Sequence, residues 1–424
     1  RTPNLYRGNL RERTFETAFL EYGAMQNLVR STGRRVWYLN DPVEDNPDHD
    51  WNDYRRNWES TLTASLLQPE VWRYEVAPWP ERVFAGRYPS GLPRDQRQPI
   101  PPAYATELQV VINALNDMNQ SKASWDCGTG GLGVLVSDSL MFERGEPNGS
   151  DAHLSQFYGL ALPLVKRGMP VTPVQLENLT VPDYLKGFEV LLLSYHGQKP
   201  LTPEVHTALA DWVKGGGTLL VVDDDADPHN RVREWWNSEG RTYATPRQHL
   251  FEQLGIKDTA FDSAKPGAVV RVSRGRAYWW RTNPAALARS AEGDQQLAAL
   301  LRTAVTATGL PWREANHLLL RRGPYVIGAG LDESVSDEPT VLHGHFVNLF
   351  DSQLRVRSEV SLAPASRCFL LDLDAVHPQE PVVLASACKA LRGPGKGSDL
   401  HLTVEGVANT PGLLLLGGVH AAPK

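Results

Sequence analysis

Apolar residues repeat first at helical and then at strand spacing over the opening quarter of the chain. This pattern predicts a helix from Glu12 to Ser31, a strand over 36–39, a second helix over 50–67 and a second strand over 71–74. The order helix, strand, helix, strand implies parallel strands joined by a right-handed crossover. A further amphipathic helix is predicted over 104–118.

Residues 132–240 alternate short apolar strands with helices. The strands expected at 134–137, 190–194 and 218–222 are almost continuously apolar, which is typical of parallel strands that are covered on both faces. A flavodoxin-like α/β domain is therefore predicted, and the segment up to residue 317 is expected to complete it.

From residue 318 onward the long helices end and short alternating strands are separated by Gly, Pro, Asp and Ser turns. This pattern predicts a C-terminal β-sandwich. Its strands are expected at 325–329, 344–349, 354–362, 368–373, 382–387, 400–404 and 412–416.

Each of the first two predicted strands runs directly into carboxylates, prolines and aromatic residues. In (β/α)8 barrels, the catalytic side chains stand at such carboxyl ends. Two βα units cannot form a barrel alone, so they either dock on another element or belong to a barrel that begins elsewhere. We favour the second interpretation, in which the N-terminal half-barrel is a separate chain, a removed segment or an omitted portion.

The predicted fold class is α/β multidomain: residues 1–125 form the C-terminal portion of a (β/α)8 barrel, 126–317 a flavodoxin-like or class I amidotransferase-like domain, and 318–424 a β-sandwich.

Charge and composition exclude some functions and favour others. A net charge of −6 over 424 residues does not indicate binding to nucleic acids or to anionic membranes. No apolar run is long enough to span a bilayer. The three cysteines are scattered without metal-ligand spacing, so no metal or other cofactor is predicted, and a cytoplasmic or periplasmic location fits equally well. The 12 Trp and 13 Tyr suit a carbohydrate surface, or simply the cores of large domains.

Glycoside hydrolysis requires two carboxyl groups that flank the scissile bond. Asp41 and Glu75 directly follow the two predicted strands, and Glu44 lies in the first of the two loops. These three acids are the predicted catalytic residues, although acids at such positions also cap helices or pair with arginines. The predicted substrate-binding residues around them are Trp37, Asn40, Asp45, Trp51, Tyr74, Trp79 and Arg82.

Other motifs carry weaker signals. The glycine-rich run 128–133 precedes a strand and lacks a Lys-Ser/Thr pair, which argues against a phosphate loop. The acidic run 223–227, with His229 close by, is either a divalent-cation site or, as we prefer, a solvated turn. Ser194 and His196 are only two residues apart and cannot face each other as nucleophile and base. Because no cysteine follows a strand in this domain, a thiol amidotransferase is disfavoured.

The domain order resembles that of glycoside hydrolase family 42, the β-galactosidases. In that family the middle domain is an amidotransferase-like trimerisation domain without a catalytic thiol, and the seventh barrel strand ends in a Glu nucleophile within a Trp-hydrophobic-hydrophobic-Glu run. The corresponding run here begins at Trp37 and places Asn40 or Asp41 at the nucleophile position. The family's eighth strand carries aromatic and Arg residues, and its acid/base Glu lies on a fourth strand that this sequence does not contain. The resemblance implies a divergent hydrolase that forms homo-oligomers.

The leading hypothesis is a hydrolase of β-linked glycosides or oligosaccharides. Asp41 would be the nucleophile or water-activating carboxylate, and Glu75 the second acid or an acceptor for sugar hydroxyls. The expected partners are a carbohydrate substrate and further copies of the chain, as a trimer or dimer through the α/β domain. A second hypothesis is a non-catalytic carbohydrate-binding or oligomerisation protein. A third is an amidotransferase-like hydrolase centred on residues 132–240.

Overall fold

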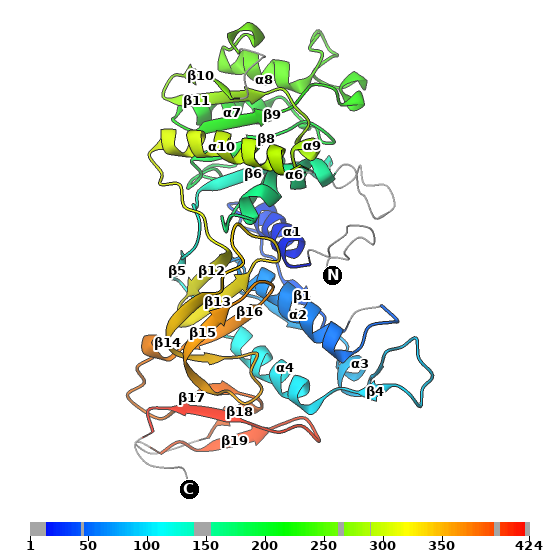
Figure 1. Cartoon of the computed structure of the whole chain (residues 1–424), viewed down its shortest axis with the longest axis vertical. Coiled ribbons are helices and arrows are strands. Elements are labelled where there is room, and N and C mark those ends of the chain that lie inside the picture. The colour runs from blue at the N-terminus through cyan, green and yellow to red at the C-terminus, as the bar shows by residue number, and fades with distance from the viewer. Residues whose placement is uncertain are drawn as a thin grey trace.

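The computed structural model describes residues 14–43, 46–139, 154–261, 267–288, 290–393 and 399–419. Figure 1 shows an elongated molecule with a helix-covered parallel sheet at one end and antiparallel strands at the other. The N-terminal helices lie between these two parts (Figure 1). None of the helices in the described ranges combines the length and apolarity that crossing a bilayer requires.

The N-terminal part is a β–α–β unit flanked by helices. Its two strands are parallel, as the order of elements predicted, with Tyr38 opposite Tyr74. Pairing starts two residues later than expected in the first strand and three residues later in the second. Just before these strands, the Arg73 guanidinium lies over the rings of Trp37 and Trp72. The elements are α1 (Thr14–Val29), β1 (Tyr38–Asn40), α2 (Trp51–Leu66), β2 (Tyr74–Val76), α3 (Pro80–Phe84), β3 (Arg87–Tyr88), β4 (Gln98–Pro99) and α4 (Pro102–Leu115).

Helix α2 begins where Asp50 caps it. The Asp50 carboxylate accepts hydrogen bonds from the backbone of Asn52 and Asp53 at 2.7 and 3.0 Å, and the Asp53 carboxylate accepts from Asp50 N at 3.1 Å. This reciprocal capping box satisfies backbone donors that the first turn leaves unpaired. The predicted apolar stripe of this helix is fully buried and consists of Tyr54, Trp58, Leu62 and Leu66.

The central part is a six-stranded sheet in the order β10-β11-β9-β8-β6-β7. All neighbouring strands are parallel except β10, which pairs antiparallel with β11. Alternate residues of β8 enter two different cores, Leu192 the one containing α6 and α10, and Leu191 the one containing α7 and α8. Burial on both faces explains why these strands are apolar throughout. The strands are β6 (Leu132–Val136), β7 (Thr172–Gln175), β8 (Val190–Leu193), β9 (Thr218–Val222), β10 (Ala268–Val272) and β11 (Gly275–Trp280); the helices are α6 (Leu154–Val165), η1 (Leu176–Asn178), α7 (Glu204–Lys214), η2 (Pro228–Arg231), α8 (Pro246–Leu254), η3 (Asp258–Ala260), α9 (Pro284–Ala288) and α10 (Ala291–Thr308).

The C-terminal part contains a six-stranded antiparallel sheet in the order β15-β14-β16-β13-β12-β5. Its edge strand β5 comes from before residue 126 and pairs with β12. Two separate two-stranded ladders, β17 with β20 and β18 with β19, follow in the chain. The elements are β5 (Ala123–Trp125), β12 (His317–Arg322), β13 (Tyr325–Gly330), β14 (Thr340–Asn348), β15 (Val356–Leu362), β16 (Arg367–Asp372), η4 (Leu373–Ala375), β17 (Val382–Ser386), β18 (Lys389–Arg392), β19 (Leu402–Glu405) and β20 (Leu414–Gly417).

A buried arginine ties the N-terminal unit to this antiparallel sheet. The Arg322 side chain on β12 is fully buried and donates to the carbonyls of Val71 and Met118 at 2.6 Å and of Leu66 at 3.2 Å. These carbonyls belong to the last residue of α2, to the chain that enters β2 and to the segment after α4. Charge-assisted bonds of this kind fix the position of β2 relative to the sheet.

The α/β class with several sheets is confirmed. The structure describes one parallel pair, β1 and β2, in the segment predicted to end a barrel. The barrel, the β-sandwich and the predicted domain limits therefore stay predictions.

Candidate functional site

The carboxyl ends of β1 and β2 lie side by side because the two strands are parallel and in register, with Asn40 opposite Val76. Asp41 is the first residue after β1, and its side chain is 14% exposed. Its Oδ1 accepts a hydrogen bond from Val43 N at 3.1 Å, and Arg82 Nη1 on α3 lies 3.6 Å from its Oδ2. The carboxylate is thus held in a fixed position, beside a positive charge, at the edge where barrel enzymes place catalytic groups.

The neighbouring strand contributes an acid and an aromatic ring. Glu75 pairs with Leu39 in the ladder and its side chain is exposed. Trp79 precedes α3 and is 60% exposed, so its indole is available to a ligand. Of the predicted site residues, Arg82 lies beside Asp41, Glu75 is the middle residue of β2 rather than the residue after it, and Trp79 directly precedes α3.

Several predicted substrate-binding residues lie in the core instead. Trp51 is 4% exposed, donates from Nε1 to Gln98 O at 2.9 Å and packs edge-on against Tyr88 and Tyr104. Asn40 is fully buried, and its amide donates to the Tyr22 hydroxyl at 3.0 Å. Neither side chain faces solvent, because both fill the core that packs against the short sheet of β1 and β2.

Tyr74 and Trp37 also lie away from Asp41. The Tyr74 hydroxyl donates to Val71 O and accepts from Arg322, both near the amino end of β2. Trp37 precedes β1 and stacks on Arg73, which places it at the amino end of the sheet. Glu44 and Asp45 lie outside the described residues.

A buried acid pair beneath this edge was not anticipated. Glu107 on α4 is fully buried, and Arg55 on α2 places Nη2 2.7 Å from Glu107 Oε2 and Nε 2.8 Å from Glu59 Oε1. Burial raises the pKa of Glu107 to about 10, and the nearby Glu59 carboxylate adds to this effect. Burial also raises the pKa of Glu59, although Arg55 opposes it. Glu107 therefore holds a proton at neutral pH, next to a carboxylate that Arg55 stabilises.

Tyr104 connects the acid pair to the Asp41 loop. Its hydroxyl donates to Pro42 O at 3.3 Å, and burial raises the pKa of Tyr104 well above its ordinary value, with Glu107, Glu59 and Asp41 contributing in the same direction. The sequence did contain a signal for Glu107, because it falls within the apolar stripe of α4 one turn after Tyr104. A carboxyl group on the buried face of a helix needs a partner, which the spacing alone does not identify.

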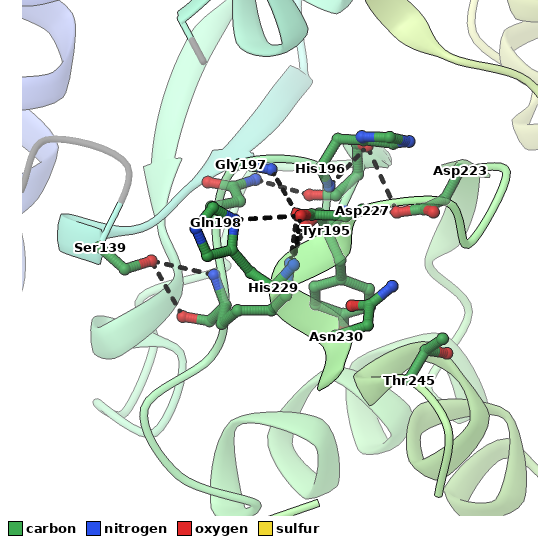
Figure 2. A network of polar contacts seen from close by, with 12 residues as sticks. Ser139, Tyr195, His196, Gly197, Gln198, Asp223, Asp227, His229, Asn230 and Thr245 are labelled. Carbon is green, nitrogen blue, oxygen red and sulfur yellow. Dashed lines mark hydrogen bonds and ion pairs between the residues drawn. The ribbon is translucent and has the colours of Figure 1, made fainter. Parts of the chain in front are cut away.

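A second polar network lies at the carboxyl edge of the six-stranded sheet (Figure 2). His196 Nε2 lies 2.5 Å from Asp224 Oδ1, and Lys199 Nζ lies 2.5 Å from Asp227 Oδ2. Burial acts to raise the pKa of Asp227, but the Lys199 ammonium outweighs it and lowers that pKa to about 2. Burial raises the pKa of Asp223, which accepts from Tyr195 N at 2.7 Å.

The geometry of this network bears on two questions from the sequence: whether residues 223–227 form a solvated turn or a cation site, and whether Ser194 and His196 face each other. Asp223 and Asp227 are 1% and 5% exposed and accept hydrogen bonds from Tyr195 N and Gly197 N, so the expectation of a solvated turn is wrong for these two residues. The His196 ring pairs with Asp224, and only its backbone N–H contacts Ser194 Oγ, as expected from their spacing. Ligand atoms of His196, Asp223 and Asp224 lie within 4.8 Å of one another, which is a fitting arrangement for a cation. Their oxygens already accept hydrogen bonds from the loop, so the arrangement also serves to hold the loop in place.

No family model matches the sequence, and no curated protein matches it either. Among solved structures, the chain resembles β-galactosidases of glycoside hydrolase family 42, the family that the domain order predicted. A catalytic mutant of Gan42B, a GH42 β-galactosidase from G. stearothermophilus, superposes with a TM-score of 0.48 at 14% identity over 87% of this chain and 59% of that one. The β-galactosidase from Rahnella sp. R3 superposes with a TM-score of 0.46 at 10% identity, over 87% of this chain and 59% of that one. The β-galactosidase from Halorubrum lacusprofundi superposes with a TM-score of 0.46 at 12% identity, over 86% of this chain and 58% of that one. This chain thus spans less than three fifths of the length of these enzymes.

Proposed function

We propose that this protein contributes to the hydrolysis of β-linked glycosides or oligosaccharides at the carboxyl edge of β1 and β2. The observation that carries the proposal is the placement of Asp41, which lies at the end of a parallel strand and is oriented by Arg82 and by Val43 N. A fixed carboxylate beside a positive charge is suited to attack an anomeric carbon or to activate water.

In this proposal the other residues at the edge have separate roles. Glu75 is the second acid or accepts hydrogen bonds from sugar hydroxyls, and the exposed indole of Trp79 stacks on the apolar face of a sugar ring. The distance between the two reacting carboxyl groups would decide between retention and inversion. The remaining barrel strands, and with them the general acid, are proposed to be supplied by another segment or chain.

The proposed architecture follows the three predicted parts, which are a barrel portion over residues 1–125, an amidotransferase-like domain over 126–317 and a β-sandwich over 318–424. The middle domain is proposed to form the contacts of a homo-trimer or homo-dimer. No cysteine follows a strand in the sequence of this domain, which supports a role in assembly rather than in thiol chemistry.

Kinetics of an Asp41→Asn variant test the proposal. With an aryl-glycoside panel as substrate, we expect kcat/KM to fall by roughly 10³-fold or more, while oligosaccharide binding is largely kept. Asp95→Asn removes the same charge from an exposed loop residue and serves as the matched control, with wild-type kinetics. Unchanged turnover in Asp41→Asn would exclude Asp41, whereas sugar binding without turnover in the wild type would favour the non-catalytic alternative.

A further inference from the structure

The amino ends of β1 and β2, opposite the Asp41 edge, form a cavity of about 320 Å³. We call it the amino-edge cavity. It is lined by the end of α1, by the loop that follows this helix and by the chain that enters β2. The lining residues used below are Arg30, Arg34, Arg35, Glu70, Trp72 and Arg73.

The charge of this cavity is strongly positive. Its lining contains four arginines and one glutamate, in a chain whose net charge is −6. Glu70 lies 3.7 Å from Arg30, which also donates to Lys186 O at 2.9 Å. Within the described part of the chain, no carboxylate pairs with Arg34, Arg35 or Arg73, so three guanidinium groups are available to an anion.

Two tryptophans provide flat apolar surfaces at this end of the strands: Trp72 lines the cavity, and Trp37 contacts the lining residue Arg73. Trp37 is 54% exposed and Trp72 is 37% exposed, and the Arg73 guanidinium lies 4.9 and 4.3 Å from their ring centroids. Stacking on both rings holds Arg73 in place without using its N–H donors. Large indoles that stay exposed beside unpaired arginines are typical of binding surfaces.

We propose that the amino-edge cavity binds an acidic oligosaccharide, in which pyranose rings carry carboxylates. The guanidinium groups would bind the carboxylates in a bidentate manner, and the indoles would stack on the apolar faces of the rings. The site lies at the opposite end of the strands from Asp41 and does not depend on catalysis there.

The shape of the cavity favours this ligand over a nucleic acid. Single-stranded nucleic acids bind along a charged track several nucleotides long, with successive bases on successive rings. Here the unpaired arginines and Trp72 line one cavity, Trp37 stacks on the lining residue Arg73, and the volume of the cavity suits a short sugar segment.

Calorimetric titration with a galacturonic acid trimer tests the proposal. We expect saturable binding that weakens as salt rises, and we expect a neutral hexose trimer and inorganic sulfate each to bind at least tenfold more weakly. An Arg34→Gln/Arg35→Gln variant should lose about tenfold or more in affinity, and Trp37→Ala should lose a similar factor. Because all three side chains are exposed, these variants are expected to fold normally.

The control variant Arg231→Gln/Arg233→Gln removes the same charge from two exposed arginines elsewhere and should bind the trimer as the wild type does. Asp41→Asn should also leave this affinity unchanged, which separates a failure here from a failure of the glycosidase proposal. Absence of trimer binding, equal binding of the neutral trimer, an equal loss in the control variant, or tighter binding of an oligodeoxythymidine would each overturn the assignment.

Discussion

Replacing Glu107 by Gln tests the buried acid pair beneath the Asp41 loop. Gln has nearly the same shape, can accept from Arg55 through its carbonyl and can donate to the Glu59 carboxylate through its amide. The substitution therefore keeps the contacts and removes only the need to hold a proton. We expect Glu107→Gln to stabilise the protein at neutral pH, although it alters a fully buried residue.

The magnitude follows from the pKa of Glu107, which rises from 4.5 to about 10 on folding. Below pH 4.5 the Glu107 carboxyl group is protonated in both the folded and the unfolded state, so its ionisation does not change the free energy of unfolding. Between pH 4.5 and about 10 only the folded state holds the proton, and stability falls as the pH rises, by about 1.4 kcal/mol per unit. At pH 7 this amounts to at most about 3 to 4 kcal/mol, and the coupling to Glu59 and Arg55 lowers the expected gain to about 2 kcal/mol.

Urea unfolding at pH 4.5 and pH 7.5 measures this effect. The unfolding midpoint of Glu107→Gln should match that of the wild type at the lower pH and exceed it at the higher pH. Glu405→Gln is the matched control, because this glutamate is 63% exposed and its surface pair with Lys389 contributes little. A loss of stability at both pH values, or a gain that does not grow with pH, would refute the protonated state assigned to Glu107.

Three further predictions concern other parts of the structure. Arg322→Met should lower the free energy of unfolding by about 3 kcal/mol or more, measured by urea unfolding, because it leaves the carbonyls of Leu66, Val71 and Met118 without their donor; a loss below about 1 kcal/mol would contradict that role. The depressed pKa of Asp227 implies stability that is present above pH 4 and is lost as the pH falls toward 2, so Asp227→Asn should destabilise by about 3 kcal/mol at pH 6, with Lys199 left unpaired, and the difference from the wild type should shrink in acid titrations. Trp79→Ala should raise KM for aryl-glycosides about tenfold with little change in thermal stability, since the indole is 60% exposed; an unchanged KM would remove Trp79 from the proposed site.

Periodicity was sufficient to predict most of the elements. The helix over 50–67 and its buried stripe follow from a 3.6-residue repeat and a capping residue, both of which are local in sequence. Strands β6, β8 and β9 of the central sheet are apolar on both faces and each is followed or preceded by a helical pattern, so their location and parallel pairing were predictable. By contrast, β5 consists of three residues and pairs with β12 nearly 200 positions later, and no local pattern records such a partner.

The candidate site was predictable only in part. Asp41 directly follows β1, as its position in the sequence predicted, whereas the prediction that Glu75 follows its strand is wrong: Glu75 is the middle residue of β2 and pairs with Leu39, because pairing in this strand starts later than the apolar run. Which aromatic residues would face the Asp41 edge depends on packing, and Trp51 fills the core between α2 and α4 because Tyr88 and Tyr104 surround it there. The pairing of Glu107 with Arg55 and Glu59 joins two helices that are distant in sequence, so the sequence revealed an unusual buried acid but not its partners.

Anion rescue of an Asp41→Ala variant tests the central proposal most directly. The truncation removes the carboxylate and leaves space beside Arg82 that a small external nucleophile such as azide can occupy. The account predicts that Asp41→Ala loses turnover of an aryl-glycoside and that azide restores it, with a glycosyl azide as the product. Wild-type turnover in Asp41→Ala without azide would contradict the role assigned to Asp41.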